Sequence, residues 1–124
     1  GDTFLTTDLG ESTCCGYSSV ETNHFYVLPG SVSGTSTLHR CYHSSAMDHL
    51  YTRSSTCEGA TGYVYEGPIG NVANSQVCGT VPLHRLWINS ATDHLYTVDS
   101  AERDSLVASG ASYEGVEGYV WLTP

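Results

Sequence analysis

Residues 38–52 read LHRCYHSSAMDHLYT, and residues 83–97 read LHRLWINSATDHLYT. Ten of these fifteen positions are identical at a constant spacing of 45 residues. A repeat of this period is typical of folds built from small supersecondary units that are stacked or arranged around an axis. Because a repeated unit can carry a repeated site, the pattern favours a multivalent binder over an enzyme with one asymmetric pocket.

The repeat extends beyond this phrase in both directions. The sequence EGATGYVY at 58–65 aligns with EGVEGYVW at 114–121. Residues 2–8 also align with residues 93–99, at a spacing of 91. The 124 residues are therefore predicted to form a single domain, 1–124. Its internal repeats are expected at about 1–28 (degenerate), 38–66 and 83–122.

Residues that favour β-structure dominate the repeats and predict a fold that is mainly β with one or two short helices (α+β). Ser100 is the expected N-cap of one helix, and Gly110 is expected to end it. Segments 30–37 and 67–80 are expected to be linkers. Antiparallel hairpins should form from strands at 24–28, 39–43, 49–52, 63–66, 84–88, 94–98 and 119–122.

Charge and apolar content exclude several kinds of partner. The chain has four arginines, no lysine and thirteen acidic residues, which give a net charge of −9. This balance argues against nucleic acid and against anionic membrane surfaces, both of which require a basic footprint. No apolar run approaches the roughly 18 residues of a membrane span. The first residue is Gly1 rather than Met, which is consistent with a removed signal peptide or with a trimmed chain.

Five cysteines in so short a chain indicate an oxidising compartment, so we expect a secreted, extracellular protein. We expect two disulfide bonds and one free thiol, in an arrangement that the sequence leaves open. The neighbours Cys14 and Cys15 are not expected to pair with each other. A catalytic cysteine is the less favoured alternative. Six histidines suggest a metal site, but His39 and His43 would lie roughly 13 Å apart on a strand, so we expect no metal and no cofactor.

Several residues recur at equivalent positions and are candidates for a sugar site, because sugars require planar hydrogen-bonding groups and an aromatic face. The repeated Asp-His pairs could instead hold a turn. The repeated arginines could form structural ion pairs, most simply with Glu58 and Glu114, and the aromatic side chains could fill the core. The candidate ligand-binding residues are His49, His94, Tyr51, Tyr96, Asp48, Asp93, Arg40, Arg85, Trp87, Glu114, Tyr119 and Trp121.

The pattern Leu-x-Arg-x-Tyr/Trp, Asp-His-Leu-Tyr-Thr, Glu-x-x-x-Leu and Tyr-Glu-Gly-x-x-Gly-Tyr-Val resembles a repeat domain of unknown function found in secreted bacterial and fungal proteins. The resemblance is strongest over 81–121, nearly as good over 38–65, and weak before residue 28. It implies a compact pseudo-threefold arrangement of small antiparallel hairpin units. In size and composition the chain also resembles the small mushroom lectins.

Together these features predict a secreted carbohydrate-binding protein, a lectin with repeated, non-catalytic glycan sites. Its expected partners are glycans or glycoproteins, and it could form a homodimer. We do not expect an enzyme, because neither a GxSxG motif nor a Gly-rich phosphate loop is present, and Glu58 and Glu114 are expected in separate units. The alternative is a secreted structural, protein-interaction or defence-effector module that binds no sugar.

Overall fold

The computed structural model describes residues 25–77 and 79–122, which form one antiparallel sheet with a helix on its outside. This confirms the expected fold class. The elements are β1 (Thr35–His43), β2 (Asp48–Thr52), the 3-10 turn η1 (Cys57–Gly59), β3 (Tyr63–Ala73), β4 (Thr80–Ile88), β5 (Asp93–Thr97), α2 (Ser100–Ala108) and β6 (Ser112–Trp121).

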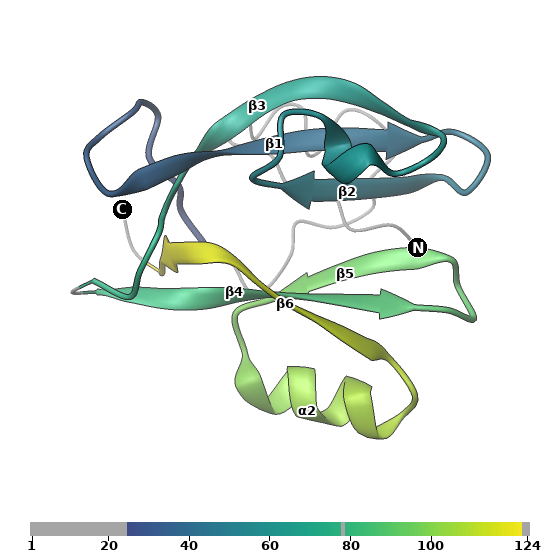
Figure 1. Ribbon diagram of the computed structural model, residues 1–124. Helices are drawn as coiled ribbons and strands as arrows, with labels where there is room; N and C mark the ends of the chain where they lie inside the picture. Colours follow the sequence, from purple (N-terminus) through teal and green to yellow (C-terminus); the bar gives the residue numbers. More distant parts are fainter. Residues whose placement is uncertain (1–24, 78, 123–124) are drawn as a thin grey trace, which may run out of the picture.

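The sheet is divided into two similar units. The strand order is β2-β1-β3-β6-β4-β5, and the central strands β3 and β6 pair only at Ala73 and Tyr119. The first unit, β1 to β3, and the second unit, β4 to β6, therefore lie as two halves of a curled half-barrel (Figure 1). The curl brings the two edge strands together, and the backbone N–H of Tyr51 in β2 donates to the hydroxyl of Tyr96 in β5 at 2.7 Å.

A third unit would require the first residues of the chain, and residues 1–24 lie outside the described part. Only the end of the expected first copy is described, and it adds two isolated bridges. Tyr26 pairs with Trp121, and Leu28 pairs with Asn71. The pseudo-threefold arrangement therefore stays a prediction.

The first two strands of each unit follow the spacing of 45, but the third strands do not follow the predicted alignment. Arg40 pairs with Tyr51 and Arg85 pairs with Tyr96. Across the third strand Arg40 pairs with Gly67, and Arg85 pairs with Gly115. The third strands thus correspond at a spacing of 48, and the alignment of 58–65 with 114–121 is wrong. The similarity misled because Glu58-Gly59 belongs to η1, whereas β3 carries its own Tyr-Glu-Gly at 65–67.

Several predicted boundaries are also wrong, and β1 already begins at Thr35, inside the expected linker at 30–37. The expected linker at 67–80 continues as β3 through Ala73, and β6 begins at Ser112 rather than at 119. Their glycines suggested turns, yet both segments pair along the neighbouring strand through bulges. The helix α2 is present, but its N-cap is Asp99 rather than Ser100, because the Asp99 carboxylate accepts from the backbone N–H groups of Ala101 and Glu102.

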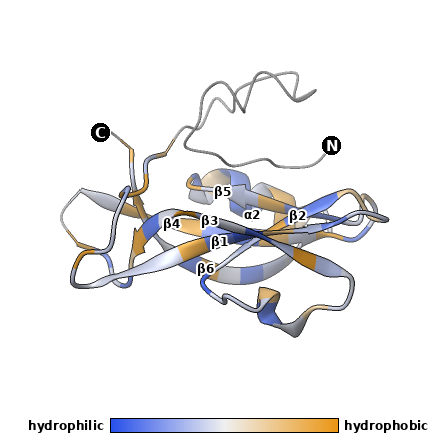
Figure 2. Cartoon of the chain, turned by 90° about the horizontal axis from the view of Figure 1, so that it is seen from above, coloured by the Kyte–Doolittle hydropathy of each residue, from blue (hydrophilic) through white to orange (hydrophobic). Residues whose placement is uncertain are grey.

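The main core is built from residues that are equivalent between the units. It consists of three pairs, Leu38 and Leu83, Tyr51 and Tyr96, and Val72 and Val120. Both units contribute their apolar side chains to one shared core. Each unit therefore buries its apolar face against the other unit. Figure 2 shows the corresponding alternation of apolar and polar bands along the strands.

On the opposite face of the sheet, the two units are covered differently. In the first unit a disulfide joins Cys41 of β1 to Cys57 of η1 and packs with Leu50. In the second unit Leu86 stands at the position of Cys41, and α2 packs beside β4 and β5 (Figure 1). Cys14, Cys15 and Cys78 lie outside the described residues, so the predicted second disulfide and free thiol stay predictions.

Candidate functional site

Each unit has a β-bulge in its third strand, and each bulge carries a glutamate. Between the pairs Arg40–Gly67 and Cys41–Tyr65 the register shifts, which leaves Glu66 as the extra residue. The same shift leaves Glu114 as the extra residue of β6. The glycine after each glutamate has a φ of 108°. A bulge re-aims a side chain away from the regular alternation of a strand, and bulges are frequent next to functional sites.

Both bulge glutamates are held by an arginine and a histidine of their own unit. In the first unit Glu66 Oε1 lies 3.0 Å from Arg40 Nε and 3.4 Å from His49 Nε2. In the second unit Glu114 Oε1 lies 2.9 Å from Arg85 Nε and 3.2 Å from His94 Nε2. The two glutamate side chains are 33% and 31% exposed, whereas the two arginines are 15% and 10% exposed. Each carboxylate is therefore fixed from inside and open to solvent outside.

An aromatic ring packs on the histidine that contacts each carboxylate. The ring of Tyr42 packs on His49 with the centroids 4.6 Å apart, and Trp87 packs on His94 at 4.8 Å. Both rings are partly exposed. We name the two groups by their carboxylates. The Glu66 site consists of Arg40, Tyr42, His49 and Glu66, and the Glu114 site consists of Arg85, Trp87, His94 and Glu114.

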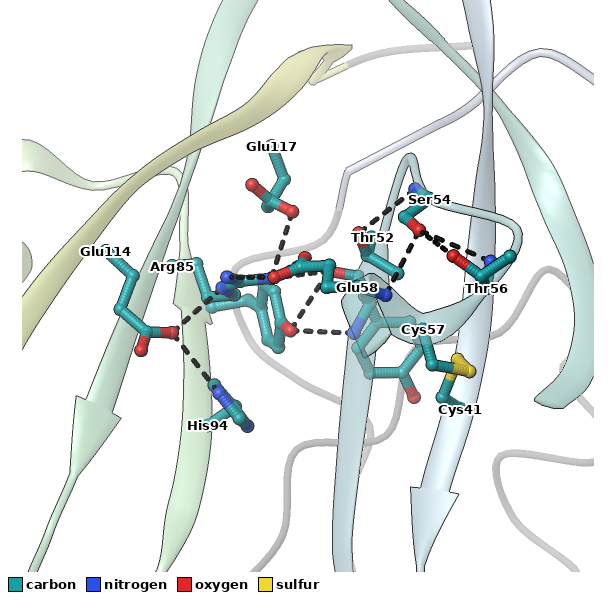
Figure 3. A network of polar contacts seen from close by, with 12 residues as sticks. Cys41, Thr52, Ser54, Thr56, Cys57, Glu58, Arg85, His94, Glu114 and Glu117 are labelled. Atoms are coloured by element: carbon teal, nitrogen blue, oxygen red, sulfur yellow. Dashed lines mark hydrogen bonds and ion pairs between the residues drawn. A yellow bond between two sulfur atoms is a disulfide. The ribbon is translucent and has the colours of Figure 1, made fainter. Parts of the chain in front are cut away.

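The Glu114 site has two further carboxylates on its arginine (Figure 3). Glu58 of η1 forms a two-point ion pair with Arg85, with distances of 2.7 and 3.1 Å. Glu117 of β6 accepts from Arg85 Nη1 at 3.0 Å. The position of Glu117 corresponds to Ile69 in the first unit. Arg85 thus connects the two units, and contrary to expectation Glu58 and Glu114 meet on the same guanidinium.

The charges around Arg85 shift the pKa values of its partners in opposite directions. The hydrogen bond from Arg85 lowers the pKa of Glu58 despite the partial burial of its carboxyl. Burial raises the pKa of Glu117, and the nearby Arg85 only partly offsets this effect. Burial would lower the pKa of Arg85 itself, but the hydrogen bond with Glu58 and the neighbouring charges raise it above its ordinary value. One guanidinium that is shared by three carboxylates therefore stabilises their charged forms to different degrees.

The repeated Asp-His-Leu-Tyr-Thr strands lie in the interior rather than on a ligand-facing surface. All five residues of β2 are buried, and so are all but Leu95 in β5. Tyr51 and Tyr96 are core residues that meet edge to face, with centroids 5.1 Å apart. Asp48 is fully buried, and its carboxylate accepts from the backbone N–H of His94 at 2.7 Å. Tyr51 and Tyr96 therefore fill the core, as the alternative interpretation stated, whereas Asp48 binds the other unit instead of holding its own turn. Asp93 is also buried.

The remaining predicted candidates lie away from both sites. Tyr119 pairs with Pro82, and Trp121 pairs with Thr80, so both lie at the end of β6 remote from Gly115. Both side chains are partly buried. Of the twelve candidates, the structure gathers His94, Arg85, Trp87 and Glu114 at one site and His49 and Arg40 at the other.

Two residues of the sites were not predicted from the sequence, Glu66 and Glu117. The repeated phrase Tyr-Glu-Gly-x-x-Gly, at 65–70 and 113–118, was the signal that could have found Glu66. The similar Glu-Gly at 58–59 obscures this signal, because it also aligns with the Glu-Gly at 114–115.

A comparison with protein-family models confirms the predicted resemblance to a domain of unknown function. The model of a domain of unknown function, DUF5648, matches residues 1–121. The chain belongs to the DUF5648 family. No curated protein and no solved structure matches it.

Within 25–77 and 79–122, no three or more His, Cys, Asp or Glu side chains are grouped in a way that could hold a metal ion. The helix in this part of the chain is too short and too polar to cross a membrane.

Proposed function

We propose that this protein binds carbohydrate without catalysis, through the Glu66 site and the Glu114 site. The observation that carries the proposal is the repeated set of a one-third exposed carboxylate, an arginine, a histidine and a partly exposed aromatic ring. The two sets use equivalent residues of the two units. A binder of repetitive glycans gains avidity from such repetition.

The chemistry of these sets suits a sugar. A carboxylate whose one oxygen is already held by an arginine can accept from a sugar hydroxyl with its exposed edge. Because the arginine and histidine fix the carboxylate in place, little side-chain freedom would be lost on binding. The adjacent ring of Tyr42 or Trp87 offers an apolar surface for the C–H face of a pyranose. At the Glu66 site the exposed Val64, which pairs with Tyr42, extends this surface.

We also propose that the protein acts outside the cell. The Cys41–Cys57 disulfide supports this, because such bonds persist mainly in oxidising compartments. A net charge of −9 without any lysine is compatible with glycan partners and unfavourable for polyanions.

Two variants of the bulge glutamates test the proposal. A glycan array probed with the wild-type protein should give binding to a defined group of structures. Glu66→Gln and Glu114→Gln should each weaken this binding, and the double variant should lose agglutination, because multivalent capture requires more than one competent site. The matched control is Glu102→Gln, which alters an exposed glutamate of α2 and should bind as the wild type does.

The alternative of a structural or protein-interaction module predicts a different result. The burial of the Asp-His-Leu-Tyr-Thr strands favours this alternative, because buried residues serve the fold and are not open to a ligand. If the array is silent for animal, plant and fungal glycans, or if the double glutamine variant binds as well as the wild type, the carbohydrate proposal is wrong.

A further inference from the structure

Two exposed tyrosines recur on the face of the sheet opposite the shared core. Tyr65 directly precedes Glu66 and pairs with Cys41, and Tyr113 directly precedes Glu114 and pairs with Leu86. Their residues are 45% and 44% exposed. They are thus adjacent in sequence to the carboxylate sites but separate from them.

Each of these tyrosines is held by a histidine of the neighbouring strand. His39 Nδ1 lies 2.8 Å from the Tyr65 hydroxyl, and His84 Nδ1 lies 2.8 Å from the Tyr113 hydroxyl. The ring centroids are 5.5 and 5.6 Å apart, with tilts of 52° and 54°. The same arrangement in both units fixes the orientation of a large ring that remains open to solvent.

We propose that Tyr65 and Tyr113 are two stacking platforms for the C–H face of a pyranose ring, in neutral β-linked sugars whose hydroxyls are all equatorial. In such sugars both ring faces present C–H groups, which pack well on an aromatic ring. The fixed hydroxyl reduces the freedom that each tyrosine would lose on binding. This inference rests on the proposed function for its ligand class and adds a second pair of sites to it.

The platform of the second unit has a cation beside it. The guanidinium of Arg103 on α2 lies over the Tyr113 ring, with Cζ 5.6 Å from the centroid. Arg103 also forms an ion pair with Asp104 at 3.0 Å and lies 3.4 Å from His84 Nε2. Arg103 therefore covers one face of the Tyr113 ring, so a sugar would stack on the opposite face.

Cellohexaose, a β-1,4-linked glucose oligomer, is the probe for this inference. Titration of the wild type should shift the aromatic NMR signals of Tyr65 and Tyr113. The double variant Tyr65→Ala with Tyr113→Ala should bind cellohexaose about fivefold more weakly, which corresponds to a loss of about 1 kcal/mol for stacking on a ring. The corresponding double change to Phe keeps both rings and should bind within about twofold of the wild type.

Tyr26→Ala is the matched control, because Tyr26 is 43% exposed and its bridge to Trp121 uses only backbone groups. This variant should bind as the wild type does. The platforms are excluded if the double alanine variant keeps full affinity, if Tyr26→Ala loses as much, or if cellohexaose does not bind at millimolar concentration.

The glutamine variants separate this inference from the proposed function. If Glu66→Gln with Glu114→Gln loses all array binding while the double alanine variant loses none, the carboxylate sites stand and the platforms are wrong. If the tyrosine change weakens cellohexaose binding and the glutamine change has no effect on any glycan, the platforms stand and the proposed sites are wrong.

Discussion

The ring of His94 and the carboxylate of Asp48 lie 2.6 Å apart, although the two residues belong to different copies of the repeat. The same Asp48 carboxylate accepts from the Tyr63 hydroxyl and from the backbone N–H of His94. The Asp of one Asp-His-Leu-Tyr-Thr phrase thus holds the His of the other. Since His94 also contacts Glu114, the junction between the units supports the Glu114 site from behind.

Removing the charge of Asp48 should destabilise the whole domain. Asp48→Asn keeps the shape of the side chain but places an amide among three donors, and leaving a buried donor without an acceptor costs about 1–3 kcal/mol. Urea unfolding at neutral pH measures the change. The control Asp104→Asn alters an exposed pair with Arg103 and should change the free energy of unfolding by less than about 1 kcal/mol. Equal effects of the two variants would contradict the buried role of Asp48.

The same carboxylate should make the protein sensitive to acid. Burial alone would raise the pKa of Asp48, but hydrogen bonds from His94 and Tyr63 lower it from 3.8 to about 2. The folded state therefore binds this proton less tightly than the unfolded state, so the stabilisation is present above 3.8 and is lost as the pH falls through about 2. Urea unfolding across this range should show a steeper loss for the wild type than for Asp48→Asn. Parallel curves would rule out Asp48 as the source.

Glu117 should have the opposite pH dependence. Because burial raises its pKa above 4.5, the folded state binds its proton more tightly than the unfolded state. Its contribution to stability is therefore present below 4.5 and declines as the pH rises through the folded pKa. The free energy of unfolding of the wild type, measured relative to Glu117→Gln, should be smaller at neutral pH than at pH 4.5. Glu102→Gln should show no such trend, and a reversed trend would contradict the burial of Glu117.

The disulfide should contribute substantially to the first unit. Cys41 and Cys57 are 16 residues apart, and closing a loop of this length stabilises a protein by about 3 kcal/mol. Cys41→Ala with Cys57→Ala should lower the free energy of unfolding by about this amount.

Intact mass after alkylation of the native wild type should show one labelled thiol, as expected for two disulfides. Three labels would refute the second bond, and an unchanged stability of the double variant would refute the role of the first.

Two equivalent glycines should tolerate no side chain. A Cβ on Gly70 would lie 2.4 Å from Val27 Cγ2, and a Cβ on Gly118 would lie 2.3 Å from Val72 Cγ2. Both have a positive φ as well, so either change to Ala should cost about 2–4 kcal/mol through clash and strain. Thermal unfolding measures the loss. Gly30→Ala, where a Cβ meets nothing within 4 Å, should remain within about 0.5 kcal/mol of the wild type.

The repeated phrase by itself determined the two-unit construction. Its β-branched and aromatic residues at a spacing of 45 predicted both hairpins, because the same local pattern forms the same strands wherever it recurs. The sequence also predicted the pairing of Arg85 with Glu114, but it did not predict that Glu58 would join the same guanidinium or that Arg40 would pair with Glu66. The helix after Thr97 followed from its acidic first turn and from Gly110.

Only the tertiary structure decided which side chains face solvent. Asp48, Tyr51 and Tyr96 are polar or amphipathic residues that could have lined a pocket, but the curl of the sheet brings β2 against β5 and buries them. Contacts between edge strands depend on the twist and closure of the whole sheet, and local pattern carries no information about either. The register of β3 and β6, and with it the place of Glu66, likewise depends on bulges that become visible only when the strands are paired.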